Sequence, residues 1–341
     1  MIEDQKTAAL AAVVKSATKA MMIAALTVAW IALMTVGISA MPLATVMAAE
    51  FDGRVAATVQ GVPVTIGELQ REVRRVLPAG EVPAAARQIL EAKALDQLVD
   101  RQLILRQLAT SQIAATTADI DRVIDRLKKQ LDERKSSLVE HLQKAELDEP
   151  AFRRFIAWQI SWERYLTRFM NEENLQKYFQ QHAREFDGSE LRVAHLLLKA
   201  KPQDDAAAVA ARIAKARQIR AEIEAGKLTF AAAVKQHSQA PTADMGGDIG
   251  WIKRQEPMPE SFSAAAFKLD VKQVSSPVQT AFGVHLIQVL EVKPGKRTWQ
   301  EARAELEPAM TQYLFQYLAD QERSKTKIEY TELAPRLPDN R

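Results

Sequence analysis

Residues 192–198 of the chain read RVAHLLL, and residues 282–287 read FGVHLI. In both segments a histidine stands among aliphatic residues, a pattern that indicates a strand buried on at least one face. Because alternate residues of a strand share a face, the residues two positions before and two positions after His195 lie on the same face as its imidazole. The same holds for His285. The sequence therefore predicts two strands that each put a histidine among apolar side chains.

Between these strands the pattern changes to helical. An alanine-rich helix is expected from about 205 to 225, a second over 230–237 with Thr229 as its N-cap, and a third over 261–267. Small helices that surround strands of this kind predict an α+β domain with one sheet.

Four segments in this order carry a family resemblance. The two histidine strands flank residues 246–251 (GGDIGW) and residues 274–280 (VSSPVQT). The ordered set resembles the parvulin (PpiC-type) family of peptidyl-prolyl cis-trans isomerases. The resemblance implies a four-stranded antiparallel sheet with surrounding helices over 189–293, isomerisation of prolyl bonds, and no cofactor or metal.

The resemblance also implies the site residues. The positions of the family's paired active-site histidines and of a nearby hydroxyl are held by His195, His285 and Thr280. The proline pocket of the family corresponds here to Ile249, Met258 and Phe262.

One position departs from the family. A prolyl bond isomerises slowly because amide resonance must be broken, at a barrier of about 18–20 kcal/mol. A catalyst without a covalent step holds the ring in an apolar pocket and stabilises the twisted amide. Ala240 stands where parvulins usually have a polar Cys or Asp, so we expect weaker catalysis with binding and fold retained.

Composition excludes other functions. Lys and Arg number 46 against 43 for Asp and Glu, which gives a net charge of +3 without a basic tract, so no nucleic-acid partner is expected. The chain has no cysteine, which excludes thiol catalysis, thiolate metal sites and disulfides. The remaining histidines, His141, His182 and His237, have no ligand-like spacing, and no metal is expected.

The N-terminal segment predicts export. Residues 20–49 contain no charged side chain, Lys15 and Lys19 stand just before them, and small residues follow at 48–49. This is typical of a signal peptide, and the stretch is also long enough to span a bilayer once. Residues 1–49 are therefore expected to be a cleaved signal or an N-terminal membrane anchor, with the rest exported to the periplasm or cell envelope.

Both flanks of the predicted isomerase domain are helical. Residues 50–188 open with a short strand at 54–59 and a turn at 60–63, and Thr65 with Glu68 forms a capping box. Helices are expected over 84–108, after Thr117, from the Asp148 start signal and over 173–181.

The C-terminal flank, residues 294–341, carries a second capping box at Thr298 and Glu301, then a helix and a short strand near 327–330. A lone helix needs a surface to cover its apolar face, so it is expected to return to the N-terminal lobe. The layout resembles exported foldases of the SurA/PrsA type, with a parvulin domain inserted in a mainly α-helical chaperone lobe.

The sequence leaves three functions open. The first is an exported prolyl isomerase and foldase that acts on unfolded, proline-containing polypeptides. The second is a holdase whose parvulin domain binds peptide with little or no catalysis, as Ala240 suggests. The third is an assembly factor for one dedicated envelope or secreted partner. Client identity and oligomeric state are not specified by the sequence.

Overall fold

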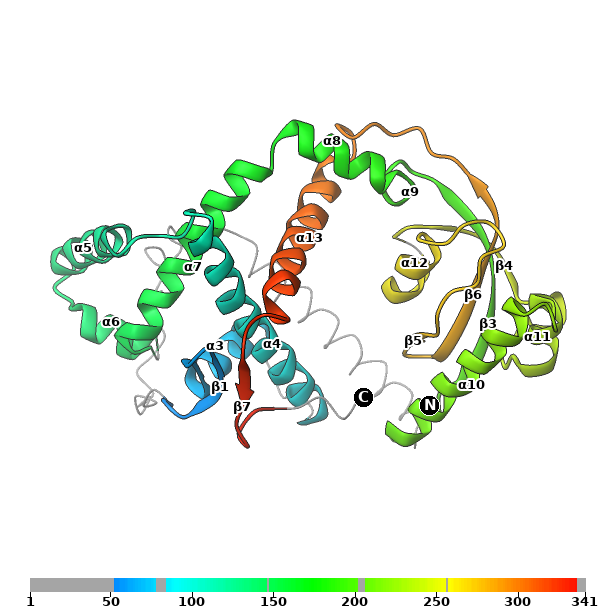
Figure 1. Cartoon of the computed structure of the whole chain (residues 1–341), viewed down its shortest axis with the longest axis horizontal. Coiled ribbons are helices and arrows are strands. Elements are labelled where there is room, and N and C mark those ends of the chain that lie inside the picture. The colour runs from blue at the N-terminus through cyan, green and yellow to red at the C-terminus, as the bar shows by residue number, and fades with distance from the viewer. Residues whose placement is uncertain (1–51, 78–83, 146, 202–205, 256, 336–341) are drawn as a thin grey trace. The chain divides into compact units, whose positions relative to one another are not determined.

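A computed structural model describes residues 52–77, 84–145, 147–201, 206–255 and 257–335 (Figure 1). The expected signal or anchor, residues 1–49, lies outside the described residues. The described chain divides into two compact units, one of residues 175–307 and one that joins 52–174 to 308–335. Within the described ranges, no helix is both long enough and apolar enough to cross a bilayer.

The unit of residues 175–307 is built on one antiparallel sheet. Its strands are β3 (Glu190–Lys199), β4 (Asp248–Lys253), β5 (Val278–Thr280) and β6 (Gly283–Lys293), in the order β4-β3-β6-β5. Both predicted histidine strands form, as β3 and β6, and they pair with each other in the centre of the sheet. The expected four-stranded antiparallel sheet is confirmed.

Helices cover both faces of this sheet (Figure 1). On one face α10 (Ala206–Glu224) and α11 (Phe230–His237) pack on Leu196 and Leu286. On the other face α12 (Glu260–Ala266) packs on Val193 and Ile287, two residues that flank the histidines in sequence. The alternation of β3 and β6 therefore sorts their side chains into two cores, and both histidines fall on the α12 face.

Short elements complete this unit. They are the four-residue helix α9 (Ala183–Phe186) and the single 3₁₀ turn η1 (Ala243–Met245). Helix α11 begins after Thr229, whose hydroxyl accepts a hydrogen bond from the Ala232 N–H at 3.1 Å, as its N-cap pattern predicts.

The second unit contains a three-stranded sheet in the order β2-β1-β7, formed by β1 (Val55–Val59), β2 (Val62–Thr65) and β7 (Ile328–Tyr330). The turn predicted at 60–63 is shorter than expected. Gln60 and Gly61 both have positive φ, +51° and +80°, which gives a two-residue hairpin and lets β2 begin at Val62.

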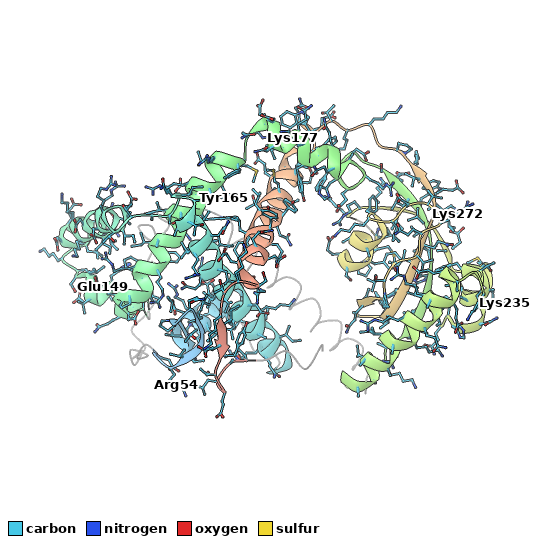
Figure 2. The ribbon with its side chains drawn as sticks, in the orientation of Figure 1. Arg54, Glu149, Tyr165, Lys177, Lys235 and Lys272 are labelled. Carbon is cyan, nitrogen blue, oxygen red and sulfur yellow. The ribbon has the colours of Figure 1, made fainter. Side chains whose placement is uncertain are left out.

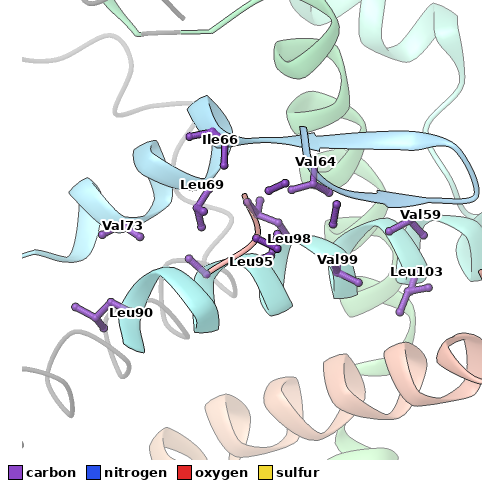
Figure 3. Packing of buried hydrophobic residues seen from close by; sticks show 14 of the residues in the cluster. Val59, Val64, Ile66, Leu69, Val73, Leu90, Leu95, Leu98, Val99 and Leu103 are labelled. Carbon is purple, nitrogen blue, oxygen red and sulfur yellow. The ribbon is translucent and has the colours of Figure 1, made fainter. Parts of the chain in front are cut away.

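Helices α3 (Ile66–Val76) and α4 (Ala84–Thr110) pack on this small sheet (Figure 3). The predicted capping box starts α3, because Thr65 Oγ1 accepts from the Glu68 N–H while the Glu68 carboxylate accepts from the Thr65 N–H. The core between them is aliphatic and includes Val59, Val64, Leu69, Val73, Leu90, Leu95, Val99 and Leu103.

Further helices extend this unit: α5 (Thr117–Glu133), α6 (Leu138–Lys144) and α7 (Glu149–Phe169), on which Figure 2 labels Glu149 and Tyr165. The next helix, α8 (Glu172–Gln181), crosses into the unit of residues 175–307. Helix α7 starts at the predicted signal, with the Asp148 carboxylate accepting from the Ala151 N–H at 2.7 Å. Helix α6 was not predicted, since seven residues show too little periodicity, although Ser137 and Glu140 form its capping box.

The last helix, α13 (Arg303–Arg323), begins later than the sequence predicts. The Thr298–Glu301 capping box forms, with the Thr298 N–H 2.7 Å from Glu301 Oε2, but it stabilises a turn that precedes the helix. Farther along α13, the buried Phe315 ring meets Trp158 and Trp162 of α7 edge to face, at centroid distances of 5.8 and 5.9 Å. Together with the pairing of β7 to β1, this contact joins the C-terminal residues to the N-terminal helices.

We predict that Phe315→Ala destabilises this unit by about 3–5 kcal/mol, because a buried ring is lost and a cavity remains beside the stacked indoles of Trp158 and Trp162. Urea unfolding followed by tryptophan fluorescence measures the change. Tyr313→Ala is the control, since Tyr313 is 48% exposed on the same helix, and it should cost less than about 1 kcal/mol. Equal effects of the two substitutions would show that α13 does not depend on the aromatic contact.

Candidate active site

Two buried histidines form the centre of the site. In the register of β3 and β6, His195 pairs with Ile287 and Leu197 pairs with His285, so the two imidazoles project side by side from neighbouring strands. Their Nδ1 atoms are 3.1 Å apart, and the rings stack at 5.3 Å between centroids. Only 8% of His195 and 2% of His285 is exposed.

The contact between the two Nδ1 atoms limits which ring nitrogens carry a hydrogen. Two nitrogens at hydrogen-bond distance need one donor and one acceptor, so one Nδ1 carries a hydrogen and the other does not. His285 Nε2 lies 2.8 Å from Thr280 Oγ1, and that oxygen also accepts from the Phe282 N–H at 3.1 Å. The chain of hydrogen bonds therefore accommodates two neutral rings, in either of two opposite proton arrangements.

The electrostatics keep both rings neutral. Burial lowers the pKa of His195. Burial, and secondly the neighbouring His195, lower the pKa of His285 to about 4. Neither ring is an imidazolium at neutral pH, so the pair acts as a rigid set of neutral hydrogen-bonding groups, without general-acid capacity at that pH.

Phe262 lies against both histidines. Its fully buried ring meets His195 edge to face at 5.8 Å and His285 at 5.4 Å. The two other residues expected in the proline pocket, Ile249 and Met258, are half-buried and pack on the cluster that contains Phe262. The structure thus brings together the three residues expected in the catalytic centre and the three expected in the pocket.

The segment that holds Ala240 runs along the end of β3 that lies beyond the pairing of β3 with β4. The Gln239 N–H donates to the Leu197 carbonyl at 2.8 Å, and the Ser238 hydroxyl accepts from the N–H groups of Leu197 and Ala240. Ala240 is buried, at 6% exposed. The strand that carries His195 therefore has an apolar methyl group beside it at the departed position.

Sequence reasoning did not identify Ser238 and Gln239 as positioning residues. Besides the Ser238 contacts, the Gln239 side-chain oxygen accepts from the Lys199 N–H at 2.8 Å. The signal in the sequence is only a serine after the end of a helix, and its partners are about forty residues away, so local pattern does not reveal it.

The surroundings of Gly247 show why this position of the glycine-rich segment 246–251 requires glycine. Its carbonyl accepts from the His195 N–H at 2.9 Å, and its φ is +81°. A Cβ at this position would lie 2.3 Å from the His195 carbonyl oxygen. Only glycine allows this close approach, which fixes the backbone of His195 from the β4 side.

Comparison with known proteins agrees with this geometry. Residues 195–291 match the family described as "Rotamase: PPIC-type PPIASE domain". This part of the chain is therefore a PpiC-type domain of the parvulin family, as the sequence resemblance predicts.

The curated relatives are chaperones. Over 113 residues the chain is 40% identical to "Chaperone SurA" of Escherichia coli O6:H1 and 39% identical to "Chaperone SurA" of Salmonella choleraesuis. Each match covers 32% of this chain and 25% of the relative, so the chain spans about a quarter of the length of these proteins.

The chain is also similar to proteins of solved structure. A PpiC-type peptidyl-prolyl cis-trans isomerase domain is 25% identical, with 33% of this chain and 98% of that chain covered and a TM-score of 0.29. PrsA from Bacillus anthracis is 22% identical, with 68% and 96% covered and a TM-score of 0.30. At these TM-scores the family assignment rests on the sequence match.

The lowered histidine pKa values predict a pH-dependent stability. Below pH 6.5 the unfolded chain protonates its histidines, whereas the folded domain keeps His285 neutral down to about pH 4. The stability of this domain is therefore full above pH 6.5, falls by about 1.4 kcal/mol per pH unit for this one group as the pH drops toward 4, and then levels off.

Amide hydrogen exchange in β3 and β6, corrected for intrinsic rates, measures the stability of the domain between pH 7 and 4.5. His285→Gln should flatten the profile, while His237→Gln, which leaves the buried pair intact, should not. A profile of unchanged slope in His285→Gln would mean that the buried pair does not set the pH dependence.

Proposed function

We propose that the protein is a peptidyl-prolyl cis-trans isomerase and chaperone that acts on unfolded, proline-containing polypeptides. The observation that carries the proposal is the stacked, neutral pair of His195 and His285 beneath Phe262, inside a segment that matches the PpiC-type family. The proposed substrate is the prolyl bond of an extended chain.

The proposed mechanism needs no covalent step. The proline ring packs on Met258 and Ile249, which rest on the cluster of the buried Phe262, and these apolar groups exclude water from the amide. The two histidines and Thr280 hold the floor of the site in one geometry, because each is bound by its neighbour. The apolar surroundings favour the twisted amide, which has lost its resonance charge separation, over the planar one.

Ala240 sets the proposed level of activity. Its methyl group offers neither charge nor a hydrogen bond to the twisting amide. Apolar packing and desolvation then supply the rate enhancement without a polar contribution from this position. If the same site binds peptide but does not isomerise it, the protein is a holdase or a dedicated assembly factor.

The second unit is proposed to be the chaperone lobe. Residues 52–174 and 308–335 form it together, and the domain of residues 175–307 is inserted between them in sequence. The name of the SurA relatives supports a chaperone role, and the basic and then apolar N-terminus supports export to the cell envelope, by a cleaved signal or an anchor.

Two substitutions separate binding from turnover. Phe262→Ala should weaken binding of a short Ala-Pro peptide at least tenfold, about 1.4 kcal/mol, because the pocket wall is removed. Ala240→Asp should raise the isomerisation rate about tenfold or more with little change in affinity, since the carboxylate acts on the transition state. Peptide titration and exchange spectroscopy measure the two quantities.

The matched controls are Trp251→Ala and Ala240→Asn. Trp251 is 46% exposed in the same domain, and its loss should change affinity less than about twofold. Ala240→Asn adds the same bulk as aspartate without the charge. An inert Ala240→Asp in a protein that already turns over rapidly would show that another group provides the electrostatic stabilisation.

A further inference from the structure

The helical unit contains a small pocket lined by arginines and aromatic rings. Its volume is about 30 Å³, and α3, α4 and α7 contribute to its walls. The residues that matter for its chemistry are Glu68, Arg71, Arg101, Arg154, Phe155 and Trp158. None of them belongs to the unit that contains the histidine pair.

Two of these arginines already have carboxylate partners. Arg101 donates to both oxygens of the buried Glu72, at 3.1 and 3.4 Å, and its guanidinium lies 5.8 Å from the Trp158 ring. Arg154 donates to Glu68 Oε1 at 3.0 Å. The other Glu68 oxygen is occupied by Thr65 in the capping box.

Arg71 is in a different position. Its Nη2 is 4.0 Å from Glu72 Oε1, beyond hydrogen-bond distance, and that oxygen already accepts from Arg75 and Arg101. Its buried Nε has no hydrogen-bond partner among the described residues, and neither has that of Arg101 or Arg154. Arg71 differs from those two because it makes no hydrogen bond to a carboxylate of the described chain through its Nη atoms. The guanidinium instead lies 5.3 Å from the Phe155 ring, with 14% of the side chain exposed.

The cluster carries an excess of positive charge. Among the described residues, three guanidinium groups, those of Arg71, Arg101 and Arg154, share the two carboxylates of Glu68 and Glu72. Burial lowers the pKa of Arg71, and the nearby Arg75 and Arg101 lower it further, while Glu72 and Glu68 oppose them.

Glu72 is ionised throughout the working pH range, since burial is outweighed by Arg101 and Arg75, which lower its pKa to about 2. The negative charge of Glu72 is therefore always present, and an added anion would offset the remaining excess of positive charge.

We propose that this pocket binds the carboxylate of an extended polypeptide, either an acidic side chain or a chain end, through Arg71. The site deepens the proposed function, on which it rests, by giving the chaperone lobe a defined chemical preference in its clients. A carboxylate fits because its two oxygens match the planar guanidinium fork.

Size and lining support the same ligand class. The volume of about 30 Å³ leaves room for a small planar group such as a carboxylate. Phe155 and Trp158 give the walls aromatic surface, which suits a carboxylate attached to a chain with apolar groups.

Three peptides of one uncharged, phenylalanine-containing sequence test the proposal on the full-length protein. The first has an internal Glu and blocked ends, the second has Gln and a free C-terminus, and the third has Gln and blocked ends. At least one of the two carboxylate peptides should bind about tenfold or more tighter than the neutral peptide, and the pair identifies which source the site prefers.

Arg71→Gln should remove this preference, and Arg71→Lys should reduce it because the charge remains but the fork is lost. The matched control is Arg74→Gln, which makes the same charge change at an exposed position on α3 and should keep the preference. If circular dichroism shows that Arg71→Gln does not fold, the test is whether Arg71→Lys reduces the preference.

Equal affinity of the unmodified protein for all three peptides would overturn the proposal, as would equal losses in Arg71→Gln and Arg74→Gln. Isomerisation of an uncharged Ala-Pro peptide is measured on the same preparations. Its absence would refute the proposed isomerase activity, whereas a carboxylate preference that survives Arg71→Gln would refute only the Arg71 site.

Discussion

The pairing of β3 with β6 is the constraint on which the site depends. These strands are far apart in sequence and pair without interruption from Val193 with Val289 to Lys199 with Gly283. A slip of one residue would move every side chain of one strand to the opposite face. Both histidines would then no longer share the α12 face, and the aliphatic residues that hold α10 and α11 would lose their partners. The same register therefore specifies the core and the site.

This pairing also explains why two histidines are tolerated inside an apolar layer. A buried polar ring is costly unless its nitrogens are satisfied. Here His195 and His285 satisfy each other at Nδ1, and Thr280 satisfies the second nitrogen of His285. Burial then favours the neutral form of both rings, which gives the site polar groups of fixed direction without charge. Phe262 covers both rings from α12 and provides the apolar wall.

Local patterns predicted much of this structure. Alternation in 192–198 and 282–287 predicted β3 and β6, and capping residues predicted the starts of α3, α7 and α11. The family resemblance predicted which side chains meet around His285. Contacts that join distant segments were not predictable in this way, because neither partner carries a local signature. The Ser238 and Gln239 contacts with β3 and the arginine pocket around Arg71 are of this kind.

We propose that this neutral, apolar site isomerises prolyl bonds. The activity is measured by two-dimensional exchange spectroscopy of a short Ala-Pro peptide with a small amount of the protein. Free prolyl bonds exchange in about 10–100 s at 25 °C. We predict cross-peaks between the cis and trans forms at mixing times of about a second or less, when the peptide alone shows none. Broadened peptide signals without cross-peaks would contradict the claim, because they would show a site that binds the proline and does not isomerise the prolyl bond.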